Sequence, residues 1–232
     1  GHPYAKLTRE TVEHAFEEYI GLLKEAGLSY VADPEKNLQV ITPVGSLKTT
    51  YAVPKGMHAG ALGFSDKKKG IIVEIKGMKG FSSTQIRETL KGSWPGLKTA
   101  QVVFPGMEAM GEVNSEHMAR FLDLPDNRVA FAERLKPLAE GVELMGLPAV
   151  LGTVNCDEAI DHLSELVGIP LFEIPTFSPS IPGLRLRENI GKMLQDKGVT
   201  QFLCSSVSSV ERGEDGLFTL TVATGVRTIK IQ

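Results

Sequence analysis

The chain has 232 residues, of which 42% are hydrophobic and 23% charged, and its formal net charge is −3. This composition is typical of a globular protein with one large or two small domains, and it excludes an intrinsically disordered chain. No apolar run approaches the ~18 residues that a membrane span needs, and no basic excess is available to bind nucleic acid or acidic lipid.

The two cysteines, Cys156 and Cys204, are far apart in the sequence. This spacing supports neither a disulfide framework nor a cysteine zinc site. The chain begins with Gly1 rather than methionine, and residues 225–232 read as a strand that stops without a turn or polar tail. We therefore expect an internal fragment of a longer protein.

The first third of the chain contains a helical period followed by two runs with strand character. The patterns predict, in chain order, an amphipathic helix over residues 8–26, a β-hairpin of strands 37–42 and 47–54 with its turn at 43–46, and an exposed glycine-rich loop over 55–70. Thr8 suits the N-cap of the helix, and Gly27 suits its left-handed C-cap.

The middle of the chain alternates between short apolar runs and helical periods. Strands are predicted at 70–77, 100–105, 143–152 and 169–175, and helices at 82–90, 115–122, 127–139 and 155–167. Such alternation favours an α/β fold with a mostly parallel, helix-covered sheet. The remainder predicts a stiff proline-rich loop over 175–183, a helix over 184–197 and a C-terminal β-meander of strands 200–212, 217–224 and 226–231.

Signals for common kinds of chemistry are weak. The loop Gly77–Gly80 follows a strand and precedes a helix, so its N–H groups could hold an anion, although an ordinary strand-to-helix turn is the commoner interpretation. Glu158 and His162 share a helix face, which favours a solvated pair over a metal site. Cys156, beside a helix start, is interpreted as a structural thiol. We expect no metal, and we assign no catalytic residue.

Two clusters of polar residues are better candidates for a binding site. In the segment 174–189 a rigid loop brings Ser178, Ser180 and Arg185 to a helix start, and the fork of an arginine suits phosphate or carboxylate. Arg187, two positions further on, points in another direction on a helix. A stiff linker with surface arginines is the alternative. Lys48, Thr49 and Thr50 could line a polar pocket or form an exposed strand face.

Three segments together resemble the B subunit of the anaerobic glycerol-3-phosphate dehydrogenase complex. They are HPYAKL at residues 2–7, ITPVGSLKTTYAVP at 41–54 and IPTFSPSIPGLRL at 174–186. The matching positions are Thr42, Pro43, Gly45 and Thr49 in the hairpin, and Pro175, Thr176, Pro179, Ser180, Gly183, Arg185 and Leu186 in the later segment. The order of these motifs covers most of the chain.

The resemblance implies a flavoprotein of the succinate dehydrogenase and fumarate reductase class. Residues 1–182 would be the cap or substrate domain of a flavoprotein of the two-dinucleotide-binding type, and residues 183–232 a partial return segment of its flavin-binding domain. Arg185 would lie near the diphosphate of FAD or FMN, with Ser180 and Pro179 beside it. Lys48, Thr49, Thr50 and Arg187 are the candidates for the substrate pocket. The N-terminal glycine fingerprint is missing, so we expect the fragment to bind no flavin.

The function implied for the parent protein is flavin-dependent transfer of electrons from glycerol 3-phosphate toward quinone. Its partners would be a catalytic flavoprotein subunit and a membrane-anchor subunit, which places it in the cytoplasm or at the inner face of the membrane, and we expect the fragment alone to be inactive. Two alternatives stay open: a non-catalytic module that docks other subunits, and a related flavoprotein that acts on another small anionic substrate.

Overall fold

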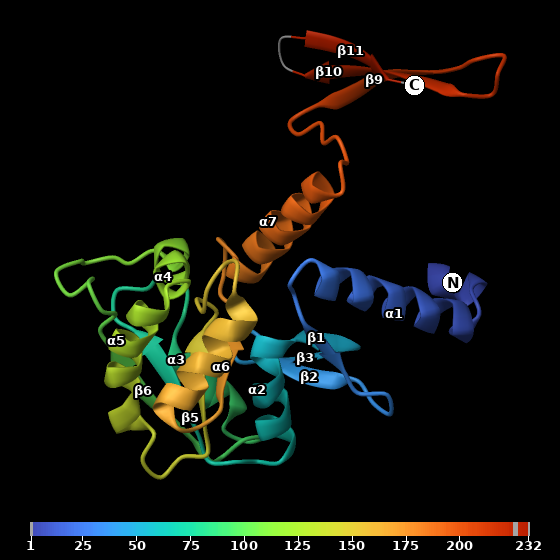
Figure 1. Ribbon diagram of the computed structural model, residues 1–232. Coiled ribbons are helices and arrows are strands. Elements are labelled where there is room, and N and C mark those ends of the chain that lie inside the picture. The colour runs from blue at the N-terminus through green and yellow to red at the C-terminus, as the bar shows by residue number, and fades with distance from the viewer. Residues whose placement is uncertain (1, 225–226, 232) are drawn as a thin grey trace. The chain divides into compact units, whose positions relative to one another are not determined.

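The computed structural model describes residues 2–224 and 227–231, and the chain divides into two units, Gly1–Gly191 and Lys192–Gln232 (Figure 1). Unit 1 contains a four-stranded sheet with the order β6-β5-β7-β8, in which every neighbouring pair is parallel. The strands are β5 (Gly70–Ile75), β6 (Leu97–Val102), β7 (Leu144–Pro148) and β8 (Leu171–Ile174). The predicted α/β class with a parallel sheet is confirmed.

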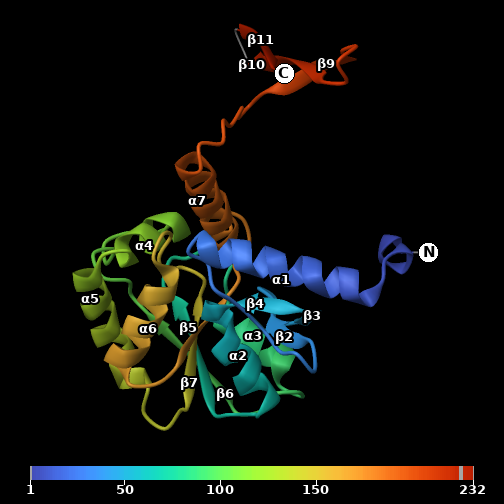
Figure 2. The same ribbon diagram turned by 45° about the vertical axis from the view of Figure 1, so that its right-hand side comes forward.

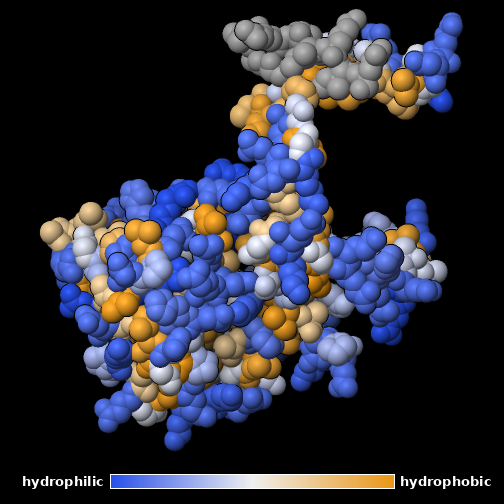
Figure 3. Space-filling model, in the orientation of Figure 1, coloured by the Kyte–Doolittle hydropathy of each residue, from blue (hydrophilic) through white to orange (hydrophobic). Residues whose placement is uncertain are grey.

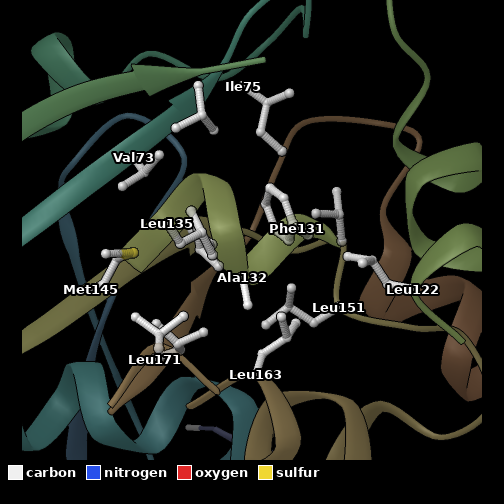
Figure 4. Packing of buried hydrophobic residues seen from close by; sticks show 14 of the residues in the cluster. Val73, Ile75, Leu122, Phe131, Ala132, Leu135, Met145, Leu151, Leu163 and Leu171 are labelled. Carbon is white, nitrogen blue, oxygen red and sulfur yellow. The ribbon is translucent and has the colours of Figure 1, made fainter. Parts of the chain in front are cut away.

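Helices cover both faces of this sheet (Figures 1 and 2). One face packs against α2 (Lys55–Ser65) and α3 (Ser83–Leu90), and the other against α4 (Ser115–Leu122), α5 (Pro125–Leu135) and α6 (Cys156–Val167). Because side chains alternate along a strand, Val73 and Ile75 of β5 pack in the core on the side of α4, α5 and α6. Ile72 packs in the core on the side of α2 and α3. Figure 4 shows Val73 and Ile75 near Phe131 and the other buried side chains of that core.

The N-terminal region of unit 1 contains the single-turn helix η1 (Pro3–Lys6) and the long helix α1 (Arg9–Glu25). The Oγ1 atom of Thr8 accepts the Thr11 N–H at 3.1 Å, so Thr8 is the N-cap, as predicted. The two-stranded sheets that follow pair β2 (Leu38–Ile41) with β3 (Leu47–Thr50), and β1 (Tyr30–Ala32) with β4 (Ala52–Pro54).

The predicted hairpin is present, but its second strand is shorter than expected. Residues 47–54 form two strands in different sheets, because the ladder with β2 stops at Thr50 and β4 pairs instead with β1. The turn is closed by the Thr42 N–H, which donates to the Ser46 carbonyl at 2.8 Å. Gly45 has φ +84, and a Cβ there would lie 2.8 Å from the Cα of Ile86, so this turn requires glycine.

The prediction of an exposed loop over residues 55–70 is wrong. Residues 55–65 form α2, and several of its small residues are buried. The glycines are sites of close helix–sheet approach rather than breaks in the helix. A methyl group at Gly60 would overlap the ring of Phe172 on β8, and one at Gly146 of β7 would come within 2.6 Å of the same ring. Composition alone does not reveal this contact.

Two prolines mark helix ends. The predicted helix over 127–139 is α-helical only to Leu135, because Pro137 follows in the short helix η2 (Lys136–Leu138) and cannot continue the α-helical hydrogen bonds. The last helix, α7 (Ile181–Asp196), begins before the predicted Leu184, because Pro182 fits the first turn of a helix, where its missing N–H leaves no bond unmade.

Unit 2 contains the predicted meander. Strands β9 (Ser206–Arg212), β10 (Phe218–Thr224) and β11 (Arg227–Ile231) form an antiparallel sheet with the order β11-β10-β9. Val226 of the expected last strand lies outside the described residues. The predicted division after residue 182 falls at the start of α7, whereas the structural units divide inside this helix, after Gly191.

Candidate functional site

The topology of the sheet directs attention to the carboxyl ends of β5 and β7. From β5 the chain passes through α3 to β6 on one side, and from β7 it passes through α6 to β8 on the other. In open parallel sheets, ligands bind at the carboxyl ends of two neighbouring strands whose following connections lead to opposite sides of the sheet. The loops that follow these two strands are residues 76–82 and 149–155, and both lie in unit 1.

A buried ion pair fixes the second of these loops. The guanidinium of Arg185 on α7 donates to both carboxylate oxygens of Glu173 on β8, at 2.6 and 2.8 Å. Its other bonds go to the loop, with Nε at 2.9 Å from the Gly152 carbonyl and Nη2 at 3.0 Å from that of Leu151. The Leu151 N–H in turn donates to Glu173 at 2.8 Å. Arg185 and Glu173 are only 4% and 3% exposed.

The pair of Arg185 and Glu173 has the electrostatic properties of a structural ion pair, in which each charge is compensated by the other. Burial alone would lower the pKa of the Arg185 guanidinium, but the adjoining Glu173 carboxylate outweighs burial and holds that pKa above its ordinary value. The pair therefore stays charged, and it joins α7, β8 and the 149–155 loop. Such a pair is costly to break, because the remaining partner would be a buried, uncompensated charge.

A second carboxylate holds the same loop from the side of α4. Asp123 accepts the Thr153 N–H at 2.8 Å, the Val154 N–H at 3.2 Å and the Thr153 hydroxyl at 2.6 Å. The fully buried Arg128 donates to the carbonyl of Asp123 at 2.9 Å and to Glu158 at 2.7 Å. Glu158 is thus paired with an arginine of α5, and the loop is held on both sides.

A small cavity lies beside Arg185. It is lined by residues that include Tyr30, Cys156, Glu173 and Arg185, and its volume is about 20 Å³. This is the size of one water molecule, too small for a flavin or its diphosphate. Burial raises the pKa of the Cys156 thiol to about 11, so this sulfur is protonated at neutral pH, in agreement with the predicted structural role. Burial also raises the pKa of Tyr30.

The other predicted site residues lie elsewhere. Lys48 and Thr49 are exposed on β3, and the Thr50 hydroxyl donates to the Ala52 carbonyl at 3.2 Å. Arg187 is exposed on α7, and the Ser180 hydroxyl accepts the Gly183 N–H at 3.3 Å. The cavity beside Arg185 contains none of these residues in its lining. Their roles toward flavin or substrate stay predictions, as does that of Arg185.

A larger cleft lies at the same end of the sheet, and we call it the Thr176 cleft. Its volume is about 490 Å³, and it is formed by the loop after β5, the start of α4 and the segment after β8. The lining residues are Met78, Lys79, Glu112, Val113, Asn114, Ser115, Thr176, Phe177, Ser178 and Pro179. Thr176 belongs to the 174–186 motif, in which no role was predicted for it, and the Gly77–Gly80 loop, a predicted candidate for anion binding, contributes two of the lining residues.

The described part of the chain contains neither a metal cluster nor a membrane helix. No group of three or more His, Cys, Asp or Glu side chains in this part is arranged to hold a metal ion. Within the same residues, no helix combines the length and the hydropathy that a membrane span requires.

Comparison with known proteins identifies named relatives. No protein-family model matches the chain. The B subunit of anaerobic glycerol-3-phosphate dehydrogenase from Pectobacterium carotovorum is 28% identical over 204 residues, which cover 85% of this chain and 48% of the relative. The same subunit from Yersinia pestis is 28% identical over 206 residues. That of Vibrio vulnificus is 27% identical over 228 residues, or 94% of this chain and 52% of the relative.

These relatives confirm the resemblance that the three sequence motifs predicted. The chain spans about half the length of the curated relatives that it matches. Over 85–94% of its length, the chain is a relative of the B subunit of anaerobic glycerol-3-phosphate dehydrogenase.

Proposed function

We propose that this chain is part of a protein that acts as the B subunit in the anaerobic oxidation of glycerol 3-phosphate. The observation that carries the proposal is the similarity to proteins of that name over 85–94% of the chain. In the proposed function, the complete protein passes electrons from glycerol 3-phosphate toward quinone. FAD or FMN would supply the redox chemistry, and the protein would bind and orient it.

The proposed arrangement makes residues 1–182 the cap or substrate domain and residues 183–232 part of the chain's return to a flavin-binding domain. The parallel sheet with helices on both faces supports a domain that presents loops at one edge. The described residues do not themselves form a flavin cradle around Arg185, since the cavity there is the size of one water. The flavin would therefore be held mainly by other parts of the complete protein.

The proposed partners are a catalytic flavoprotein subunit and a membrane-anchor subunit. The word subunit in the names of the relatives supports an assembly of more than one chain. The membrane anchor would hold the complex at the inner face of the cell membrane, with this protein on the cytoplasmic side.

The test uses the complete protein that contains this chain, co-expressed with the two proposed partner subunits. We expect flavin to copurify with the complete protein, and its visible absorbance to bleach when glycerol 3-phosphate is added anaerobically in the presence of the catalytic partner. The same complex without this protein should pass electrons to quinone more slowly. A complete protein that purifies with its partners but contains no flavin would contradict the redox role.

Variants of the two arginines separate binding from folding. Arg187→Ala in the complete protein removes an exposed side chain, so its stability should be unchanged and any lost activity would reflect the substrate pocket. Arg185→Ala breaks the pair with Glu173, so flavin content must be measured per folded molecule. Full flavin content in the folded Arg185→Ala protein would remove this residue from the cofactor site.

The docking alternative is favoured by a different observation. Helix α1 buries one residue, Leu23, whereas Tyr19 and Leu22 are 52% and 40% exposed. Elsewhere, on the face of unit 1 drawn in Figure 3, hydrophilic residues dominate and apolar ones form small groups between them. If docking is the role, Tyr19→Ser with Leu22→Ser should release the partner subunits on gel filtration while flavin content stays constant.

A related flavoprotein with another small anionic substrate would instead bleach with that substrate and not with glycerol 3-phosphate.

A further inference from the structure

We propose that the Thr176 cleft binds the oxyanion group, phosphate or carboxylate, of a small metabolite. The inference does not depend on the proposed oxidation of glycerol 3-phosphate. It depends on three features of unit 1: a buried hydroxyl without a partner, the N-terminal end of a helix, and a lysine at the rim.

The hydroxyl of Thr176 is the observation that points to a ligand. Thr176 is 7% exposed and lines the cleft, and its Oγ1 has no hydrogen-bond partner. Buried polar side chains almost always have a partner, because an unpaired one forfeits its hydration without compensation. Within the described residues it is the sole buried side-chain atom in this state. A ligand atom in the cleft that accepts or donates a hydrogen bond would supply the missing partner.

The start of α4, which also lines the cleft, adds positive electrostatic potential. The helix has eight residues, beginning at Ser115, and its N-cap is Asn114. The Asn114 side chain accepts the N–H groups of Glu116 and His117 at 2.8 and 3.4 Å, which leaves the first turn's remaining N–H of Ser115 beside the cleft. The helix dipole favours an anion at this end.

The rim carries one cation and one competing carboxylate. The Lys79 ammonium lies 2.6 Å from the Glu112 carboxylate, and the two side chains are 78% and 62% exposed. An exposed pair of this kind is worth little, so a bound oxyanion can draw Lys79 away from Glu112 at small cost. The Glu112 carboxylate repels an anion in the cleft. Removing its charge should therefore strengthen anion binding, whereas removing the charge of Lys79 should weaken it.

The shape of the cleft limits the ligand to a small molecule. A volume of about 490 Å³ falls in the range of small-molecule sites, roughly 300–1,000 Å³. Two of the three segments that form the cleft are tied together, because the Val113 N–H, just before α4, donates to the Gly77 carbonyl after β5 at 3.1 Å. Met78, Val113 and Phe177 provide an apolar surface for a short carbon chain.

The experiment is a titration of the isotope-labelled 232-residue chain with inorganic phosphate, acetate and glycerol, followed by amide chemical shifts. We expect saturable shifts for phosphate or acetate, centred on Met78, Ser115 and Thr176, and none for glycerol. Shifts that do not saturate and that spread over surface lysines would overturn the proposal. So would binding of glycerol as tight as that of the anions.

Variants then assign the contacts. Thr176→Val keeps the shape and removes the hydroxyl, so it should weaken binding about tenfold or more, whereas Thr176→Ser should keep most of the affinity. Lys79→Gln should weaken binding and Glu112→Gln should strengthen it several-fold. Lys98→Gln, an exposed lysine on β6, is the matched control and should change nothing. Unchanged binding in both Thr176→Val and Lys79→Gln would overturn the assignment.

The ligand-free stability of the same variant provides a second readout. Because the Thr176 hydroxyl has no partner, Thr176→Val should raise the midpoint of thermal unfolding of the free chain, and added phosphate should stabilise the parent chain more than this variant. A lower midpoint for Thr176→Val would show that the hydroxyl is satisfied within the protein, and the proposal would fail. The test of flavin content and of bleaching by glycerol 3-phosphate in the complete protein can succeed or fail whatever these anion-binding and stability measurements give.

Discussion

Two regions at the carboxyl end of one sheet differ in whether their buried polar groups have hydrogen-bond partners. Around the 149–155 loop, Arg185, Glu173 and Asp123 are buried or partly buried, and their charged groups make hydrogen bonds to the loop or to each other. In the Thr176 cleft, a buried hydroxyl has no partner. Complete pairing is typical of a scaffold, and an unpaired buried group is typical of a position that a ligand completes.

The largest effect is expected from breaking the paired region. Glu173→Ala leaves the Arg185 guanidinium buried without its counter-ion and frees the Leu151 N–H, so it should lower the free energy of unfolding by about 3–5 kcal/mol. Urea denaturation measures this loss. The matched control, Arg120→Ala, removes exposed pairs with Glu116 and Glu188 and should cost less than about 1 kcal/mol. Equal losses in the two variants would contradict the scaffold role.

The second effect concerns pH and the buried thiol beside the pair. Because burial raises the pKa of Cys156 from 9.0 to about 11, the unfolded chain loses this proton at lower pH than the folded chain. The contribution of the buried thiol to the free energy of unfolding is therefore complete below about pH 9. As the pH rises from about 9 toward 11, the free energy of unfolding should fall by about 2–3 kcal/mol.

The measurement for Cys156 is urea denaturation across this alkaline range, with Cys156→Ala as the reference that removes the titrating group. We expect the stability of the parent chain to fall more steeply than that of the variant. Parallel curves would show that the thiol is not buried as described. Exposed Cys204 should react with iodoacetamide much faster than Cys156 in the folded chain.

The third effect tests the close approach of α2 to the sheet. Gly60→Ala places a methyl group against the Phe172 ring and should cost about 1–3 kcal/mol through overpacking. Gly21→Ala, in the exposed part of α1 where a Cβ meets nothing within 4 Å, should instead stabilise by about 1 kcal/mol. Thermal unfolding of both variants gives the comparison. A stabilising Gly60→Ala would contradict the contact.

The smallest effect concerns the helix start at the cleft. Asn114→Ala removes the acceptor for two N–H groups of α4 and should cost about 1 kcal/mol, with Asn114→Ser retaining most of the stability. Far-UV circular dichroism during urea denaturation measures the difference. An alanine variant as stable as the parent would show that the cap contributes little here.

Local patterns explain which parts of the fold could be predicted. The helix α1 and its cap at Thr8, the strands of the parallel sheet and the C-terminal meander follow from periodicity and turn residues near in sequence. Helix α2 was missed because its glycines meet Phe172, a residue that lies far along the chain on β8. The break between β3 and β4 was missed for a similar reason, since β4 finds its partner in β1.

The candidate site depended even more on distant contacts. The sequence identified Arg185 as an arginine suited to an anion, but only the fold shows that the anion beside it is Glu173, an internal carboxylate. No pattern around Thr176 indicates that its hydroxyl is buried or unpaired, because the walls of the cleft come from three separate segments.

The sequence by itself determined the α/β class, the β-meander and the kinship with the dehydrogenase B subunits, because hydrophobic period, turn residues and motif order are local properties of the chain. The tertiary structure alone decided which polar groups are satisfied. Burial and hydrogen bonding depend on side chains that folding brings together from distant positions, and this is the physical reason that Arg185 and Thr176, close neighbours in one motif, have opposite environments.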